Sequence, residues 1–336
     1  MKKSVSLTRR FVLATGVTLG AAAAAVVVVA LVVSPTSGSI AALDLPSRAA
    51  VPPDAAGEPL WQAWHPPADL ASAGRIGSVH IPPTASGFAA RDAEVYLPPA
   101  ALVPNPPLLP FVLMMMGQPG DPDAGPIAQV LDQFAATHNG LAPIVVVADQ
   151  LGDPDVDSLC LDTPRYGNVQ TYIEQDVVDW AVANLGILSG RDQWTVAGFS
   201  NGGQCAISLA AKFPGVWGNV ISASGTTYAG VETESDVLAD VFDGDQQAYD
   251  ASKPETAMAD TPYPDTSAVF TVGADDDFIG PGFRDLSEKA RAAGMTTTTY
   301  EVPGEGHTTE ALTQGLQRAF DTLAPRLSLV PPAERR

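Results

Sequence analysis

A serine between two glycines marks the stretch of this chain that is best suited to chemistry. The pentapeptide Gly198-Phe199-Ser200-Asn201-Gly202 has the G-x-S-x-G pattern, in which a serine projects from a sharp turn between a strand and a helix. Residues 193–197 before it have the pattern of a short buried strand, and residues 203–212 after it have the pattern of a helix. The sequence therefore predicts Ser200 as a nucleophile, in preference to an ordinary glycine-rich turn.

A serine nucleophile needs a base that takes up its proton. The chain contains 4 histidines, and only His307 follows Ser200, as the chain order Ser, then Asp or Glu, then His requires. His307 lies in a glycine-rich loop between a strand-like run at 296–302 and a helix-like run at 309–323. A solvated loop histidine is the alternative, but a loop at the end of a strand is a suitable place for a catalytic base.

The base in turn needs an acid that orients it, and three adjacent aspartates are candidates. Asp275, Asp276 and Asp277 directly follow a strand-like run at 267–273. Like charges this close repel one another, which indicates that at least one of them has a task. Three solvated turn carboxylates are the alternative. We favour Asp276 as the acid, followed by Asp275 and then Asp277.

The motifs at 198–203, 272–278 and 303–307, taken in this order, resemble a known family. They are similar to the esterases of the esterase D and antigen 85 (mycolyltransferase) group, above all to its exported actinobacterial members. The resemblance covers roughly residues 75–325 and includes the stretches 113–120 and 160–168. It implies an α/β-hydrolase fold and a serine esterase, and it places the acid at Asp276. Many hydrolases carry histidine at the position of Met116, but that histidine is structural.

Cleavage of an ester also requires N–H donors for the negative charge that develops on the carbonyl oxygen. One donor is expected to be the backbone amide of Asn201, the residue after the nucleophile. The other should come from the loop at 117–120, which follows a strand-like run at 110–116. The family resemblance assigns this role to Gln118. An ordinary strand-to-helix turn is the alternative.

The elements that must position these residues alternate between strands and helices. Residues 144–148 form a continuous apolar run, which is typical of a parallel strand covered on both faces, and 220–221 indicate another strand. Helical patterns are predicted at 127–138, 170–186, 202–212, 282–293 and 309–323. The alternation predicts a doubly wound, mostly parallel α/β sheet. An acidic segment at 224–264 interrupts it and is expected to be an insertion over the mouth of the site.

The N-terminal segment predicts export. Two lysines and two arginines precede an uncharged stretch from Phe11 to Val33, which spans about 34 Å as a helix. This length favours an uncleaved single-pass anchor with the enzyme outside the cell; a cleaved signal ending near Ala41 and a secreted protein is the alternative. The expected organisation is an anchor or signal at 1–33, a Pro-, Ser- and Ala-rich tether at 34–58, an esterase domain at 59–328 and a tail at 329–336.

Charge and cysteine content agree with export. The net charge is −20, and removal of residues 1–41 would take away four positive charges and no negative ones, leaving −24. Such a chain is not expected to bind nucleic acid. Cys160 and Cys205 are the 2 cysteines, and in an oxidising compartment an isolated pair predicts a disulfide, with two buried thiols as the alternative.

No metal or cofactor is expected. Residues 153–157 imitate the start of an EF-hand loop, but Ser158 and Pro164 stand where its glycine and its bidentate glutamate belong. A phosphate-binding loop with lysine is also missing. The sequence thus predicts a serine esterase for a small-molecule or lipid ester. Two alternatives are an acyltransferase of the mycolyltransferase type that transfers to a sugar hydroxyl, and a non-catalytic cell-envelope binding module. The oligomeric state is not predicted.

Overall fold

A computed structural model describes residues 58–332, and its centre is one mixed sheet. Within this range, eight strands follow the order β1-β2-β4-β3-β7-β8-β9-β10. Their bounds are β1 Arg75–Val79, β2 Ala93–Leu97, β3 Phe111–Met115, β4 Ile144–Val147, β7 Trp194–Phe199, β8 Asn219–Ala223, β9 Ser267–Gly273 and β10 Thr296–Val302. Neighbouring strands from β4 to β10 are parallel, whereas β1 and β2 add an antiparallel edge.

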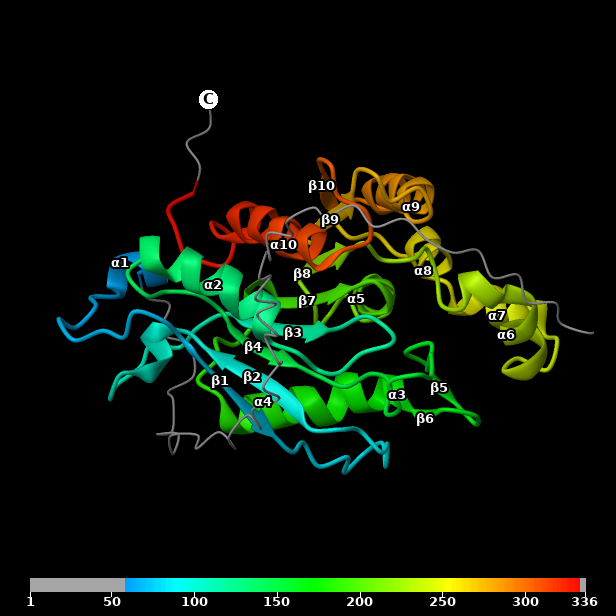
Figure 1. Ribbon diagram of the computed structural model, residues 1–336, viewed down its shortest axis with the longest axis horizontal. Coiled ribbons are helices and arrows are strands. Elements are labelled where there is room, and N and C mark those ends of the chain that lie inside the picture. Colours follow the sequence, from blue (N-terminus) through cyan, green and yellow to red (C-terminus); the bar gives the residue numbers. More distant parts are fainter. Residues whose placement is uncertain (1–57, 333–336) are drawn as a thin grey trace, which may run out of the picture. The chain divides into compact units, whose positions relative to one another are not determined.

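Helices cover the sheet on both faces. The helices that flank it are α2 Gly125–Thr137, α4 Val178–Asn184, α5 Asn201–Lys212, α9 Gly280–Ala292 and α10 Thr309–Leu323. In Figure 1, α2 and α10 lie together above the sheet and α4 lies below it. The prediction of a doubly wound, mostly parallel α/β sheet is confirmed. The predicted helix at 170–186 is one helical stretch that begins as α3 Val169–Thr171, passes through a π-helical segment at Tyr172–Val177 and continues as α4.

Short elements complete the described chain. They are α1 Leu60–Ala63, the 3₁₀ turns Pro99–Leu102, Arg191–Gln193 and Val231–Thr233, the small ribbon β5 Asp162–Thr163 with β6 Gly167–Asn168, and the helices α6 Glu234–Asp240, α7 Gln246–Ser252 and α8 Pro254–Asp260. The last three lie in the insertion between β8 and β9. Figure 1 shows α6 and α7 projecting beyond the end of the sheet, and α8 packs against α5 and α9.

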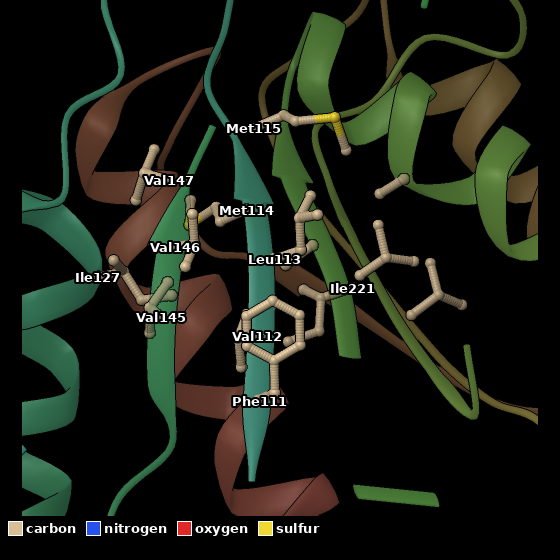
Figure 2. Packing of buried hydrophobic residues seen from close by; sticks show 14 of the residues in the cluster. Phe111, Val112, Leu113, Met114, Met115, Ile127, Val145, Val146, Val147 and Ile221 are labelled. Carbon is tan, nitrogen blue, oxygen red and sulfur yellow. The ribbon is translucent and has the colours of Figure 1, made fainter. Parts of the chain in front are cut away.

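The core explains why the central strands are continuous apolar runs. Every residue of β3 is fully buried, and its neighbour β4 is buried along its whole length. Figure 2 shows side chains of β3 and β4 packed with Ile127 of α2 and Ile221 of β8. A strand covered by helices on both faces has no solvent-facing side, so polar alternation is absent. The core thereby holds the carboxyl ends of β3, β4 and β7 at one edge.

The expected N-terminal anchor at 11–33 and most of the tether at 34–58 lie outside the described residues, as do residues 333–336. Between residues 58 and 332, no helix has the length and apolar character needed to cross a membrane.

Candidate active site

Ser200 occupies a strained turn between β7 and α5. Its backbone angles are φ 55° and ψ −119°, in the left-handed half of the map that residues with a side chain rarely adopt. Its neighbours must be small: a Cβ on Gly198 would lie 2.0 Å from the carbonyl oxygen of Gly202, and one on Gly202 would lie 2.1 Å from that of Met115. The predicted turn between strand and helix is therefore present, with the serine at its apex.

Three predicted residues come together in one hydrogen-bonded chain. His307 Nε2 lies 2.9 Å from Ser200 Oγ, and His307 Nδ1 lies 2.8 Å from Asp276 Oδ2. An ionised carboxylate only accepts hydrogen bonds, so Nδ1 carries the ring proton and donates it to Asp276. Nε2 is then free to accept the hydroxyl proton of Ser200. This is the geometry that general-base activation of a serine requires.

Burial distinguishes Asp276 from the two aspartates beside it. Asp276 is 7% exposed, while Asp275 and Asp277 are exposed to solvent. The second oxygen of Asp276 accepts the backbone N–H of Ile279 at 3.1 Å, which fixes the carboxylate after β9. The backbone N–H of Asp275 instead donates to the carbonyl of Glu305 in the histidine loop. This backbone bond ties together the two loops that carry the acid and the base.

The imidazole also has an aromatic support. The rings of Phe199 and His307 are stacked, with centroids 5.0 Å apart and an interplanar angle of 25°. Phe199 is the residue before the nucleophile, so the turn supplies both the serine and a wall for the base. Sequence reasoning missed this contact, because the second position of G-x-S-x-G is free in the pattern and only the folded turn shows where the Phe199 ring points.

The two predicted oxyanion donors lie on segments that meet at Ser200. A Cβ on Gly117, the residue before Gln118, would lie 3.2 Å from Ser200 Cβ, so the loop after β3 passes directly beside the nucleophile. Asn201 is the first residue of α5, where backbone N–H groups have no partner inside the helix. Within residues 58–332, the backbone amides of Gln118 and Asn201 donate to no backbone carbonyl. Both are thus available to a developing oxyanion.

Cys160 and Cys205 form a disulfide with a Cα–Cα distance of 5.7 Å, as the sequence predicted. It joins the loop after β4 to α5, one helical turn beyond Asn201. The EF-hand-like stretch in the same loop has protein partners: Asp157 Oδ1 accepts hydrogen bonds from the backbone of Leu159 and from the side chain of Asn201. Among the described residues, no group of three or more acidic, histidine or cysteine side chains is arranged to hold a metal ion.

The insertion brings one more charge toward the site. Glu232, in the 3₁₀ turn Val231–Thr233, is exposed, but partial desolvation and the negative charge of Asp157 raise its pKa, which His307 partly lowers. Burial likewise raises the pKa of Asp157, against the hydrogen bonds that it accepts. Glu232 therefore interacts electrostatically with both Asp157 and His307. Glu232 was not singled out from the sequence, because nothing local distinguishes it from the many other acidic residues, and Asp157 was noted only as part of the EF-hand-like stretch.

Solved structures share this fold. The chain is similar to a ferulic acid esterase (TM-score 0.63, 14% identity, 76% of this chain and 99% of that chain). It is also similar to an S-formylglutathione hydrolase from Agrobacterium tumefaciens (TM-score 0.61, 17% identity, 76% and 97%). Identities this low establish the fold alone, which is the predicted α/β-hydrolase fold.

Sequence comparison establishes the family. An uncharacterized protein of Corynebacterium glutamicum is 32% identical over 252 residues, which make up 72% of this chain and 58% of that protein. The chain thus spans little more than half the length of this relative. The family model described as putative esterase matches residues 89–311, which include Ser200, Asp276 and His307. The match confirms the predicted resemblance and, at the level of the family, the prediction of an esterase. The chain belongs to the putative esterase family.

Proposed function

We propose that the protein is a carboxylic-ester hydrolase that works through an acyl intermediate on Ser200. The observation that carries the proposal is the continuous hydrogen-bonded chain from Asp276 through His307 to Ser200 Oγ on a strained turn. Chance placement of these three groups in the order and geometry of a catalytic triad is improbable, because they come from three separate loops. Family membership supports the same activity.

The proposed reaction assigns one step to each of these groups. Ser200 Oγ attacks the ester carbonyl carbon while its proton passes to His307 Nε2, and Asp276 stabilises the imidazolium. The backbone amides of Gln118 and Asn201 hold the negative carbonyl oxygen. His307 then gives its proton to the leaving alcohol, and the acyl group stays on Ser200. A water molecule, deprotonated by His307, attacks the acyl-serine and releases the acid.

The test compares the wild-type protein with Ser200→Ala on 4-nitrophenyl esters of increasing chain length. We expect Ser200→Ala to lose activity by about 10⁶-fold in kcat, because the triad acts as a unit, while the fold is kept. Mass spectrometry after treatment with a fluorophosphonate should show one adduct on Ser200. Activity of Ser200→Ala within about tenfold of wild type would remove Ser200 as the nucleophile. Faster release of nitrophenol with glycerol or trehalose, together with the acylated acceptor, would indicate acyl transfer in place of hydrolysis.

We further propose that the domain works outside the cell and is held at the membrane by residues 11–33. The length of this uncharged segment and the positive charges before it support the proposal. The disulfide is in keeping with an oxidising compartment. Cell fractionation should recover the full-length chain with the membrane. Mature protein in the medium, beginning near residue 42, would show a cleaved signal instead.

A further inference from the structure

The two amides that are proposed to hold the oxyanion follow two neighbouring strands of the sheet, β3 and β7. Gln118 belongs to the loop after β3, and Asn201 begins α5. A single backbone bond joins the segments directly, from the N–H of Gly202 to the carbonyl of Met116 at 3.1 Å. Transition-state stabilisation depends on the spacing of the two donors within a few tenths of an ångström. The remaining contacts between these segments therefore decide how well the oxyanion is held.

Gln150 makes those contacts from a third element, the loop after β4. Its side chain is buried, and Nε2 donates to the carbonyl of Met116 at 2.6 Å and to Asn201 Oδ1 at 3.1 Å. A primary amide has two N–H bonds, so one nitrogen can serve both acceptors. The carbonyl of Met116 can only accept, which fixes the orientation of the Gln150 amide. One side chain thus clamps the strand end before Gln118 to the first residue of α5.

The polar chain continues to Asp157. Because Asn201 Oδ1 accepts from Gln150, Asn201 Nδ2 is the donor to Asp157 Oδ1, at 2.8 Å. The same loop also reaches the other donor segment, since Gln118 Nε2 donates to the carbonyl of Asp155 at 3.0 Å. Side chains of both oxyanion residues are therefore bound to residues 150–157. The disulfide between Cys160 and Cys205 closes this loop onto α5.

Gln150 itself cannot readily move. The side chain of the neighbouring Asp149 is fully buried. One of its oxygens accepts a hydrogen bond from Arg91 Nη2 at 2.6 Å, and the other accepts one from Arg91 Nε at 3.1 Å. The backbone carbonyl of Gln150 accepts the hydroxyl of Ser158 at 2.5 Å. A bidentate arginine–carboxylate pair fixes geometry as well as adding energy. The clamp is thus anchored to the antiparallel edge of the sheet on one side and to the disulfide loop on the other.

We infer that Gln150 is a positioning residue that sets the distance between the backbone amides of Gln118 and Asn201, with Asp157 holding Asn201 in the orientation that Gln150 needs. The inference rests on the proposed ester hydrolysis through Ser200. Gln150 touches no reacting atom. Its effect is expected to appear in the tetrahedral state, where negative charge lies between the two amides, and to be small in the ground-state complex.

The test uses Gln150→Met, which keeps the length of the side chain and removes both donors. We expect kcat/KM for 4-nitrophenyl butyrate to fall about tenfold to hundredfold, mostly in kcat, because loss of one oxyanion donor costs about 10² to 10³ and a displaced donor costs less. Butylboronic acid, which forms a tetrahedral adduct with Ser200, should bind more weakly by a similar factor. Butyrate, which forms no such adduct, should inhibit both proteins alike.

Gln193→Met is the matched control. The side-chain amide of Gln193 also donates to a backbone carbonyl, that of Arg326. Gln193, however, directly precedes the start of β7, whereas Ser200 follows the end of that strand. The Gln193→Met variant should keep kcat and boronic acid affinity within about twofold of wild type, since Gln193 is remote from the site. Wild-type kcat together with wild-type boronic acid affinity in Gln150→Met would overturn the inference, as would equal losses with boronic acid and butyrate.

A second pair of variants tests the same inference if Gln150→Met does not fold. Asp157→Ala removes the acceptor for Asn201 on a half-buried loop that the disulfide retains, and it should lose about threefold to tenfold in kcat with KM unchanged. Asp157→Asn keeps an acceptor oxygen and should recover most of that loss. Full activity in Asp157→Ala would contradict the inference. An inactive wild-type protein would instead contradict the proposed function, so the two failures are distinguishable.

Discussion

Asp276 differs from Asp275 and Asp277 in what its carboxylate touches. It bonds His307 Nδ1 and the N–H of Ile279, whereas the other two are exposed. Asp276→Asn should leave the fold intact but favour the wrong imidazole tautomer, a change that lowers kcat by about 10⁴ in serine proteases. Asp275→Asn and Asp277→Asn should stay within about threefold of wild type. Steady-state kinetics of the three variants on one ester decides the matter, and a large loss confined to Asp275→Asn or Asp277→Asn would reassign the acid.

At the scale of residues, the sequence predicts what local patterns and chain order can specify. Ser200 stands in its own motif, and His307 is the one histidine that follows it. Asp276 was favoured among the three aspartates, and the family resemblance agreed, but the turn after β9 decides which of them points inward. Gln150 and Asp157 follow the same kind of strand end, so the rule that sites form at the carboxyl ends of parallel strands could have drawn attention to them. Their hydrogen bonds depend on side-chain directions that no pattern encodes.

At the scale of elements, the buried strands were predicted well because their runs are continuously apolar. The expected strand at 144–148 is β4 at Ile144–Val147, and that at 267–273 is β9 with the same bounds. The antiparallel edge was missed, since β1 is partly exposed and has no clear alternation. The insertion was recognised by its composition, but its short helices were not. Tyr249 of α7 and Leu159 belong to a small second core that joins the insertion to the disulfide loop.

The insertion gives the site a charge preference that can be measured. Glu232 interacts electrostatically with Asp157 and with His307, so we expect a substrate with a free carboxylate in its acyl part to be repelled. Glu232→Gln should raise kcat/KM for the 4-nitrophenyl monoester of glutaric acid about threefold to tenfold relative to the neutral butyrate ester. That factor corresponds to about 1 kcal/mol, which is the interaction of two unit charges about 4 Å apart when bulk water screens them.

The gain should shrink in high salt, because exposed charges are screened. Glu288→Gln, which removes an exposed carboxylate on α9, is the control and should change kcat/KM for neither ester. An unchanged ratio between the two esters in Glu232→Gln, measured at low ionic strength, would show that the insertion does not select substrates by charge.

At the scale of the whole molecule, the fold class was readable because each layer has its own signal. Apolar strands alternate with helices along the chain, and that order alone predicts a parallel sheet covered on both faces. The order of strands in the sheet does not follow from the sequence in the same way. Contacts between distant segments do not follow from the sequence either. One example is the ion pair of Arg91 with Asp149, which joins the segment before β2 to the loop after β4.

Stability of the whole fold should depend on the protonation of Glu174. This residue lies in the π-helical segment, where one carboxyl oxygen accepts the indole N–H of Trp217 at 2.8 Å and the other is buried with no hydrogen-bond partner among residues 58–332. Burial raises the pKa of Glu174 from 4.5 to about 8, against the effect of the Trp217 hydrogen bond. Between about pH 4.5 and pH 8, Glu174 therefore keeps its proton in the folded state and loses it in the unfolded chain. The stabilisation is complete below about pH 4.5 and is lost as the pH rises toward 8.

Glu174→Gln removes this dependence, because the amide stays neutral and still accepts the Trp217 bond. Urea unfolding at pH 5, 6.5 and 8 should show the wild-type free energy of unfolding falling relative to the variant by at most about 1.4 kcal/mol per pH unit. At pH 8 the variant should be the more stable protein, whereas at pH 5 the two should be similar. Glu288→Gln serves again as the control and should follow wild type at every pH. Parallel curves for wild type and Glu174→Gln would mean that Glu174 is ionised in the folded protein and that its second oxygen finds a partner.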